Sequence, residues 1–269
     1  MKLRKNMLAS LAVLALGATP AFAVTTVFEE NFDYPDGDLD GQGTWTAYSS
    51  IGTRPVQVSS GAAVVDHGGS GEDIVGTFAL QTSGVISATF DFSVSSLPYD
   101  IGTYQSIFTG NVSSTTTASQ FDYFAGFKYG TESSTNSYFS TLALVYPSDG
   151  TEGDFRIRIS SDRFYSDATI ATANLLFDTV YQVTLTYDFD TGYATATIGS
   201  ETITSGDATS LTQNAENAGI DGVFFRQDDN SWDETITVDN LVVTTTVPEP
   251  SATLLGALGS LALLRRRRS

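Results

Sequence analysis

The chain has 269 residues, of which 13 are lysine or arginine and 31 are aspartate or glutamate, so its formal net charge is −18. Cysteine is absent, which excludes disulfides, thiolate metal sites and cysteine nucleophiles. The single histidine, His67, excludes zinc sites built from several histidines. The negative charge argues against binding to nucleic acid, which depends on lysine and arginine at the phosphates.

The first 23 residues have the three parts of a secretory signal peptide. A basic start is followed by an apolar run from Met7 to Gly17, and Ala21 and Ala23 provide the small residues of a cleavage site. The basic residues are Lys2, Arg4 and Lys5. We therefore predict export by the Sec translocon, removal of residues 1–23 by signal peptidase, and a folded domain that begins at Val24.

Residues 24–246 show no helical pattern but a repeated alternation of apolar and polar side chains, which is typical of strands with one face on a core. In residues 154–159, three apolar side chains share one face, and Arg156 and Arg158 share the other. The predicted strands 181–189 and 193–198 flank an Asp-Thr-Gly turn at residues 190–192, and this arrangement predicts a hairpin. The other predicted strands are 26–33, 61–65, 76–80, 85–94, 104–110, 121–129, 138–145, 222–226 and 235–244. This pattern predicts one all-β domain, a two-sheet antiparallel β-sandwich of the jelly-roll kind.

An acidic loop follows the first predicted strand, with Asp36, Asp38 and Asp40 at alternate positions. Alternate carboxylates on a tight turn can converge on a calcium ion. The position that supplies the bidentate glutamate of an EF-hand is Ala47 here, so an EF-hand is rejected. Two interpretations remain, a looser calcium site that includes Asp239 and a solvated acidic turn.

Aromatic and basic residues on two predicted strands form a candidate carbohydrate site. In the strand 121–129, Tyr123, Phe127 and Tyr129 occupy alternate positions, which places them on one face. If that face is the concave surface of a sheet, Tyr123 and Tyr129 stack on sugar rings while Arg156 and Arg158 donate hydrogen bonds to hydroxyls. If the face points between the sheets, the aromatic residues belong to the core.

The loop before the last predicted strand, residues 228–234, combines four acidic residues with Trp232. One interpretation is a calcium or sugar site in which Trp232 is a stacking platform. The other is a charged loop with Trp232 packed against the sandwich.

The start and the end of the domain resemble concanavalin-A-like lectin/glucanase domains of the laminin-G-like type. The matching residues are Phe32-Asp33-Tyr34-Pro35, Gly37, Leu39, Gly41 and Gly43-Thr44-Trp45 at the start, and Ile236–Val243 at the end. The resemblance implies a jelly roll whose first and last strands pair within one sheet, and a structural calcium ion. Because this fold carries lectins, glycanases and structural modules, the resemblance leaves the function open.

Motifs for glycan cleavage are missing from the sequence. Glycosidases need two carboxylates on opposite sides of the bond that they cut, and the E-x-D-x-E strand of laminarinase-type members of this fold does not occur here. His67 precedes a glycine-rich run and has no G-x-S-x-G motif with it, so we expect a surface histidine rather than a catalytic one.

The end of the chain, residues 247–269, resembles the PEP-CTERM protein-sorting domain. Pro248-Glu249-Pro250 precedes an apolar stretch, and Arg265, Arg266, Arg267 and Arg268 close the chain. As a helix, the apolar residues 252–264 would reach only about 20 Å, less than the hydrocarbon core of a bilayer, which indicates a transient membrane anchor. The resemblance implies recognition by an exosortase and a destination at the cell envelope, the surface or the extracellular matrix of a Gram-negative-type bacterium.

Without its two ends, the domain has six basic and 30 acidic residues, a net charge of −24, which favours divalent cations or neutral partners over polyanions. The leading hypothesis is an exported, non-catalytic protein that binds exopolysaccharide or has a structural role in the matrix. The alternatives are a glycoside hydrolase or lyase of the concanavalin-A-like fold, and a purely structural or adhesion module.

Overall fold

The computed structural model describes residues 22–67, 71–95, 123–130, 138–145, 154–161, 168–205, 219–227 and 234–248. These residues contain sixteen strands in two antiparallel sheets, and no helix among them. Thr26–Thr245 form one compact unit, and the two ends, Met1–Thr25 with Thr246–Ser269, form another. In the part of the chain that is described, no helix is long and apolar enough to cross a membrane.

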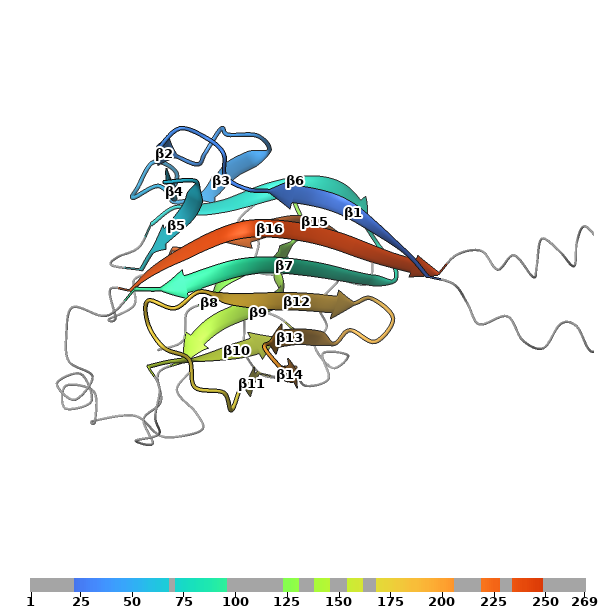
Figure 1. Cartoon of the computed structure of the whole chain (residues 1–269). Coiled ribbons are helices and arrows are strands. Elements are labelled where there is room, and N and C mark those ends of the chain that lie inside the picture. The colour runs from blue at the N-terminus through green and yellow to red at the C-terminus, as the bar shows by residue number, and fades with distance from the viewer. Residues whose placement is uncertain are drawn as a thin grey trace, which may run out of the picture. The chain divides into compact units, whose positions relative to one another are not determined.

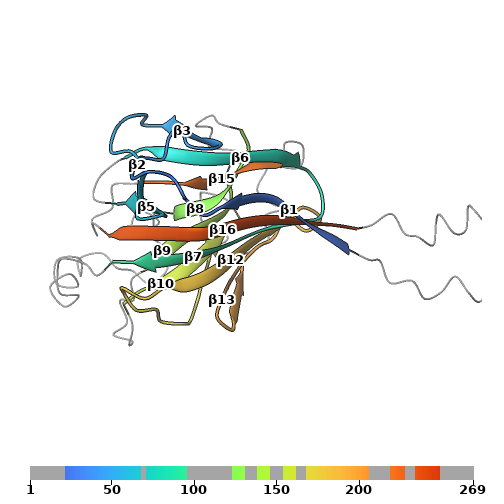
Figure 2. The same ribbon diagram turned by 45° about the horizontal axis from the view of Figure 1, so that its top comes forward.

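The nine-stranded sheet has the order β14-β13-β12-β7-β16-β5-β4-β2, and β1 also pairs with β16. Its long strands β12, β7 and β16 lie side by side, with β1 along β16 (Figures 1 and 2). Its strands are β1 (Phe22–Glu30), β2 (Gly37–Asp38), β4 (Gln57–Ser59), β5 (Ala62–Asp66), β7 (Val85–Val94), β12 (Tyr181–Asp188), β13 (Ala194–Ile198), β14 (Glu201–Thr204) and β16 (Thr235–Pro248). The pairing of β1 with β16 is the one that the resemblance to concanavalin-A-like domains implies.

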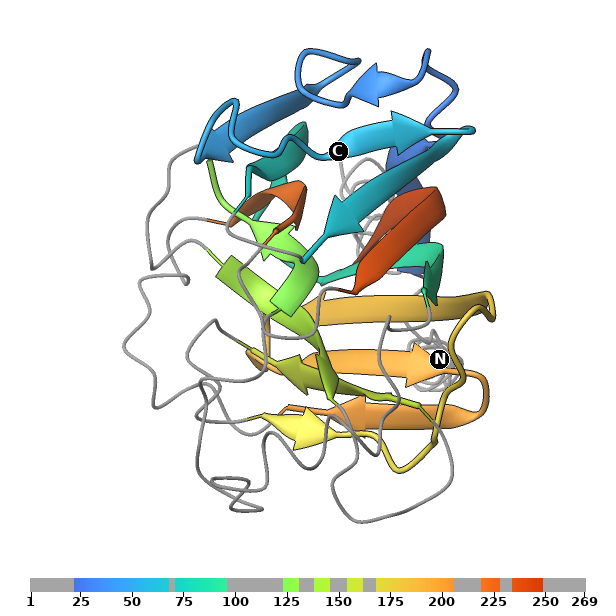
Figure 3. The same cartoon turned by 90° about the vertical axis from the view of Figure 1, so that its left-hand side faces the viewer.

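The seven-stranded sheet has the order β11-β10-β9-β8-β15-β6-β3. Its strands are β3 (Trp45–Ser49), β6 (Asp73–Gln81), β8 (Tyr123–Lys128), β9 (Tyr138–Val145), β10 (Arg156–Ser160), β11 (Thr169–Ile170) and β15 (Ile220–Phe225). The N-terminal strands β2 to β5 lie at one end of the sandwich, and β12 to β14 lie toward the other (Figure 3). The two-sheet antiparallel sandwich predicted from the sequence is confirmed.

The main core lies between the two sheets and contains buried side chains from both. Along β7, buried and half-buried residues alternate over the whole strand, with Phe90 and Phe92 pointing into the core. Trp45 of β3 stacks on Phe225 of β15 with ring centroids 5.2 Å apart. Apolar burial of this kind is the main stabilising contribution to a sandwich, because each sheet has one face that it must remove from water.

Several predicted strands have the observed bounds, and others were missed. Residues 85–94 and 138–145 form β7 and β9 as predicted, and β12 pairs with β13 around a turn in which Gly192 has a positive φ of 72°. The short strands β2, β3, β4, β11 and β14 were not predicted, because two to five residues give too little alternation to recognise. The predicted strand 104–110 lies outside the described residues.

Candidate functional site

A second cluster of buried side chains lies on the outer face of the seven-stranded sheet, which is the face turned away from the nine-stranded sheet. All its members come from strands of the seven-stranded sheet, whereas the main core draws on both sheets. The members are Tyr48, Val75, Tyr123, Tyr138, Ala143 and Phe224. We call this set, together with Lys128, Arg226 and Asp73 beside it, the outer-face cluster.

Four aromatic rings of the outer-face cluster pack edge to face. Tyr138 and Phe224 have ring centroids 5.1 Å apart, and Tyr123 lies 5.6 Å from Tyr138 and 5.7 Å from Phe224. Tyr48 lies 6.3 Å from Tyr138. Edge-to-face contacts are favoured because the positive ring edge meets the negative ring face. The rings therefore form one packed aromatic layer that links β3, β8, β9 and β15.

Two glycines allow the neighbouring strands to come close enough for this layer. A Cβ at Gly126 would lie 2.8 Å from Cε1 of Phe224 and 2.9 Å from the carbonyl oxygen of Ser140. A Cβ at Gly222 would lie 2.5 Å from Cγ2 of Val75. Both distances are too short for a real side chain, so the outer-face cluster requires glycine at these positions.

Lys128 places its ammonium group inside the aromatic layer. Its Nζ lies 4.7 Å from the ring centroid of Tyr48 and 4.9 Å from that of Tyr138, and the residue is fully buried. A buried ammonium loses its hydration, and ring faces with negative quadrupoles offset part of that loss. The position of Lys128 is therefore fixed by cation–π contacts to two tyrosines.

Tyr48 has a buried hydroxyl group that lies next to the phenol of Tyr138. Burial, the negative charge of Asp73 and the neighbouring phenols together raise its pKa well above the usual value of 10. A phenol with a raised pKa stays protonated at neutral pH. Tyr48 can therefore donate a hydrogen bond or a proton within the outer-face cluster, but it is a poor base.

Arg226 follows β15 and lies against Tyr123. The Cζ of its guanidinium group is 4.5 Å from the ring centroid of Tyr123, and its Nε is 3.9 Å from Oδ2 of Asp73. Its side chain keeps 20% of its surface exposed. The tyrosine ring thus supports the guanidinium group, while part of that group remains accessible to solvent.

His67 is a buried residue, and the expectation of a surface histidine is wrong. Its Nδ1 lies 3.0 Å from Oε1 of Glu234, and its Nε2 lies 3.1 Å from the carbonyl oxygen of Arg226. The side chains of both His67 and Glu234 are at most 1% exposed. Since a carbonyl oxygen can only accept, Nε2 carries a proton, and a further proton lies between Nδ1 and the carboxylate of Glu234. The hydrogen bond from Nε2 of His67 therefore holds the backbone carbonyl group of Arg226 in place.

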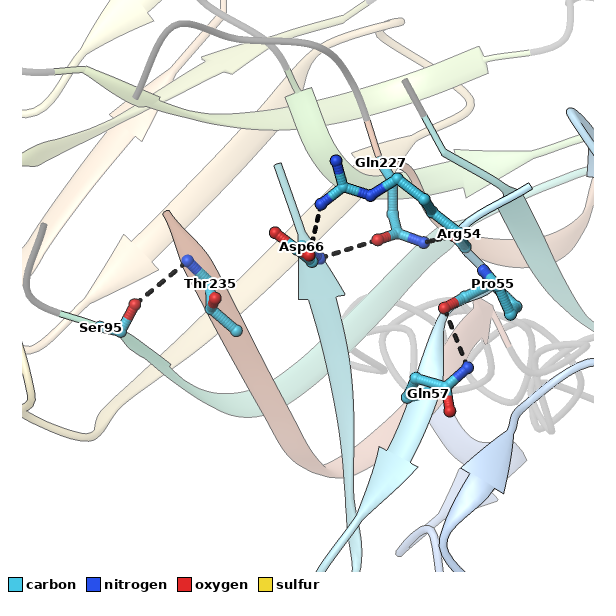
Figure 4. Close-up of polar contacts among 7 residues, drawn as sticks. All are labelled: Arg54, Pro55, Gln57, Asp66, Ser95, Gln227 and Thr235. Carbon is cyan, nitrogen blue, oxygen red and sulfur yellow. Dashed lines mark hydrogen bonds and ion pairs between the residues drawn. The ribbon is translucent and has the colours of Figure 1, made fainter. Parts of the chain in front are cut away.

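A polar network beside this pair joins three separate segments of the chain (Figure 4). Gln227 accepts a hydrogen bond from the backbone N–H of Asp66 and donates one to the carbonyl oxygen of Arg54. The guanidinium group of Arg54 pairs with the carboxylate of Asp66. These contacts connect the segment after β15 to β5 and to the residues before β4, and so they fix the chain next to Arg226.

The structure separates the aromatic residues that alternation had placed on one face. Tyr123 belongs to the outer-face cluster, but Phe127 belongs to the main core. The register between β8 and β9 shifts between Tyr123 and Ala125 and again between Ala125 and Phe127. Between Tyr123 and Ala125 the extra residue is on β8, and between Ala125 and Phe127 the extra residue is on β9. One extra residue in β8 reverses its face, so the prediction that Tyr123 and Phe127 share a face is wrong.

The predicted carbohydrate-binding residues lie in different surroundings. Tyr123 is only 4% exposed and its ring is in contact with Arg226, whereas Tyr129, just after β8, is 42% exposed. Arg158 is buried on β10, and Arg156 on the same strand donates a hydrogen bond to Asn174. Trp232 lies outside the described residues, so its role stays a prediction.

The acidic residues predicted to bind calcium have separate partners. Asp36 accepts a hydrogen bond from the N–H of residue 60, Asp38 from Gln57, and Asp40 from the N–H of Ala47. Asp239 lies on β16, and two strands, β5 and β4, separate it from β2 in the sheet order. Among the residues that the structure describes, no group of three or more such side chains could hold a metal ion. The structure does not bring these four together, and calcium binding remains an untested prediction.

The predicted processing residues lie at the two ends of the chain. Ala23 is exposed in β1, and Pro248 is the last residue of β16. The remaining predicted positions, Ala21, Glu249, Pro250 and the four arginines 265–268, lie outside the described residues.

Sequence reasoning missed most of the outer-face cluster, namely Tyr48, Asp73, Lys128, Tyr138, Phe224 and Arg226. One signal could have pointed to it. The domain has only six basic residues, and four of them stand inside predicted strands, where charged side chains are unusual. Basic residues at such positions in so acidic a domain are a signal that could have indicated a common site.

Comparisons with known proteins support the fold and the sorting tail. Residues 246–268 match the PEP-CTERM protein-sorting motif. No curated protein matches the chain. The described fold is similar to a mutant of the alginate lyase Aly36B in complex with an alginate trisaccharide, with a TM-score of 0.50 and 13% identity over 82% of this chain and 98% of that one. It is also similar to winged bean acidic lectin in complex with methyl-α-D-galactose, with a TM-score of 0.47 and 12% identity over 84% of this chain and all of that one.

The architecture is therefore a two-sheet antiparallel β-sandwich, a fold that this chain shares with the alginate lyase. The chain carries a PEP-CTERM sorting motif at its C-terminus, which indicates an exported protein that is sorted to the cell envelope or surface.

Proposed function

We propose that this exported protein binds a polysaccharide through the outer face of its seven-stranded sheet. The observation that carries the proposal is the outer-face cluster itself, in which tyrosines and basic side chains occupy a sheet face. Arginine and tyrosine side chains supply hydrogen-bond donors for hydroxyls and rings for stacking on sugars. Arg226 keeps 20% of its side-chain surface exposed, and so it is the member of the outer-face cluster that would meet a ligand first.

Cleavage of the polysaccharide by elimination is a second candidate function, and one observation favours it. A lyase must neutralise the acidic group of its substrate, remove a proton and protonate the leaving oxygen. Arg226 and Lys128 provide positive charge, and Tyr48, whose phenol stays protonated at neutral pH, is a candidate donor to the leaving oxygen. The base that takes the first proton is not assigned to any residue in the described part of the chain. A hydrolase is less well supported, because Asp73 is the one carboxylate that we find in the outer-face cluster, and hydrolysis requires two.

One experiment tests both functions. The purified protein would be titrated with a panel of neutral and acidic polysaccharides, and binding would be followed by calorimetry. In parallel, each mixture would be assayed for new reducing ends and for the unsaturated product of an elimination. Binding without new ends supports the proposal, and unsaturated products would replace it by the lyase function. Absence of binding to every polymer would refute both.

A further inference from the structure

The two sheets of the sandwich differ sharply in charge. The strands of the nine-stranded sheet contain eight aspartate and glutamate residues and no lysine or arginine. The strands of the seven-stranded sheet contain two acidic residues and three basic ones, and a fourth basic residue, Arg226, follows β15 directly. The described strands therefore separate negative from positive charge, although the whole domain is strongly acidic.

The positive charge of the seven-stranded sheet is concentrated on its outer face. Lys128 and Arg226 contact the tyrosines of the outer-face cluster. Arg158 lies directly opposite Ala143 of the cluster on the neighbouring strand, and opposite residues of a ladder share a face. Asp73 is near Arg226 and compensates one of these charges. The other acidic residue of the sheet, Asp221, accepts a hydrogen bond from a backbone N–H.

Two of the guanidinium groups lie at the ends of one row across the sheet. Tyr123 is opposite Ala143, and Ala143 is opposite Arg158, so the row crosses β8, β9 and β10. With about 4.8 Å between strands, Arg158 lies about 10 Å from Tyr123, and Arg226 lies against the far side of that tyrosine. The small side chain of Ala143 puts little bulk between the two arginines. Arg158 is buried, so Arg226 is the guanidinium group of this row that a ligand would contact directly.

The negative charge of the rest of the domain does not cancel this local field. The facing sheets of a sandwich are about 10 Å apart, and the exposed carboxylates of the nine-stranded sheet point away from the seven-stranded one. At physiological ionic strength the Debye length is about 8 Å, so these carboxylates are screened at the outer face. The net charge of the domain is thus a poor guide to the charge of its ligand, because a ligand on the outer face interacts mainly with the nearest charged groups.

We propose that the ligand of the outer face is an anionic polysaccharide, whose carboxylate or sulfate groups pair with Arg226, a guanidinium group that keeps part of its surface exposed. Guanidinium groups match such anions because they present paired N–H donors in one plane. This inference rests on the proposed function and specifies its ligand class. It differs from the expectation from net charge that the domain favours divalent cations or neutral partners.

The test compares polymers that differ in charge alone. The purified protein would be titrated with a polyuronate, with the same polyuronate after its carboxylates are reduced to alcohols, with a sulfated glycan, with neutral dextran and with double-stranded DNA. We expect binding to the polyuronate or to the sulfated glycan that weakens as salt rises, and binding at least tenfold weaker to the reduced polymer. Which of the two anionic polymers binds more tightly identifies the anionic group.

An arginine variant tests the site itself. We expect Arg226→Gln to weaken binding of the anionic polymer by about 10- to 100-fold, which corresponds to the loss of a charge-assisted hydrogen bond. Asp91→Asn is the control, because Asp91 contacts Gln182 and Asn240 on the nine-stranded sheet, and the affinity of this variant should change less than about twofold. Circular dichroism and a thermal melt of each variant separate loss of binding from loss of folding.

The outcomes are distinguishable. Equal affinity for the polyuronate and its reduced form, without a salt effect, would overturn the anionic ligand but leave polysaccharide binding intact. Equally tight binding to DNA would show attraction to any polyanion and would also overturn the inference. If no polysaccharide binds, the proposed function itself fails. If Asp91→Asn weakens binding as much as Arg226→Gln, the outer face is not the site.

Discussion

The buried pair of His67 and Glu234 makes a quantitative prediction about stability. Removing one partner of a buried, hydrogen-bonded pair costs about 3–5 kcal/mol, because the other partner is left without compensation. We therefore expect Glu234→Ala to lower the free energy of unfolding by about this amount. For a domain of 150–250 residues, 1 kcal/mol corresponds to about 2–4 °C in Tm, so the expected decrease is about 6–20 °C.

Glu234→Gln is the matched control for this prediction. The amide N–H of glutamine can donate to Nδ1 of neutral His67 while Nε2 still donates to the carbonyl oxygen of Arg226. The hydrogen bond is kept and only its ionic character is lost, so the expected cost is about 1 kcal/mol. Comparing the losses of unfolding free energy in Glu234→Ala and Glu234→Gln therefore shows the contribution of the hydrogen bond rather than that of the side-chain volume.

Thermal and urea denaturation would measure both variants, and NMR of the untagged protein would observe the pair directly. Because His67 is the only histidine of the chain, its ring nitrogens give unambiguous signals. We expect protonated Nε2 in the folded protein and a changed Nδ1 signal in Glu234→Gln. If Glu234→Ala and Glu234→Gln both lower Tm by less than about 2 °C, or if the His67 ring exchanges freely with solvent, the account of a buried pair is wrong.

Two further predictions concern alkaline pH and close packing. Burial and the hydrogen bond to Glu30 raise the pKa of Tyr34 to about 12, from 10 in the unfolded chain, so the folded state holds this proton more tightly and stability should fall as pH rises from 10 to 12. Denaturation of the Tyr34→Phe variant should lack this part of the decrease in stability. The decrease is well below the 2.7 kcal/mol that two pKa units would give, because the ring of Tyr34 is partly exposed. If the variant loses stability between pH 10 and 12 as the natural protein does, the prediction is wrong. Gly126→Ala should lower stability by about 1–3 kcal/mol, since its Cβ would contact Phe224 and the backbone, and a thermal melt equal to that of the natural protein would show that the strands can move apart.

The sequence alone determined the fold class and the sorting motif at the C-terminus. Alternation in residues 85–94 and in the hairpin from 181 to 198 identifies strands because side chains of a strand point to opposite faces at every second residue. The pairing of β1 with β16 followed from a resemblance in the first and last segments. The sorting motif is equally a local pattern, and the match to residues 246–268 confirms it.

Tertiary structure alone decided which side chains meet. Alternation assigns the residues of a strand to two faces, but this assignment fails where a bulge adds a residue to the strand. For this reason Tyr123 lies on the outer face of the sheet, whereas Phe127 lies in the main core. His67 and Glu234 are 167 residues apart, and only the pairing of β5 with β16 brings them together. The positive outer face likewise depends on strand order, because Lys128, Arg158 and Arg226 become neighbours only when β15, β8, β9 and β10 assemble into one sheet. Contacts between distant segments are a property of the sheet, and no local pattern in the chain encodes them.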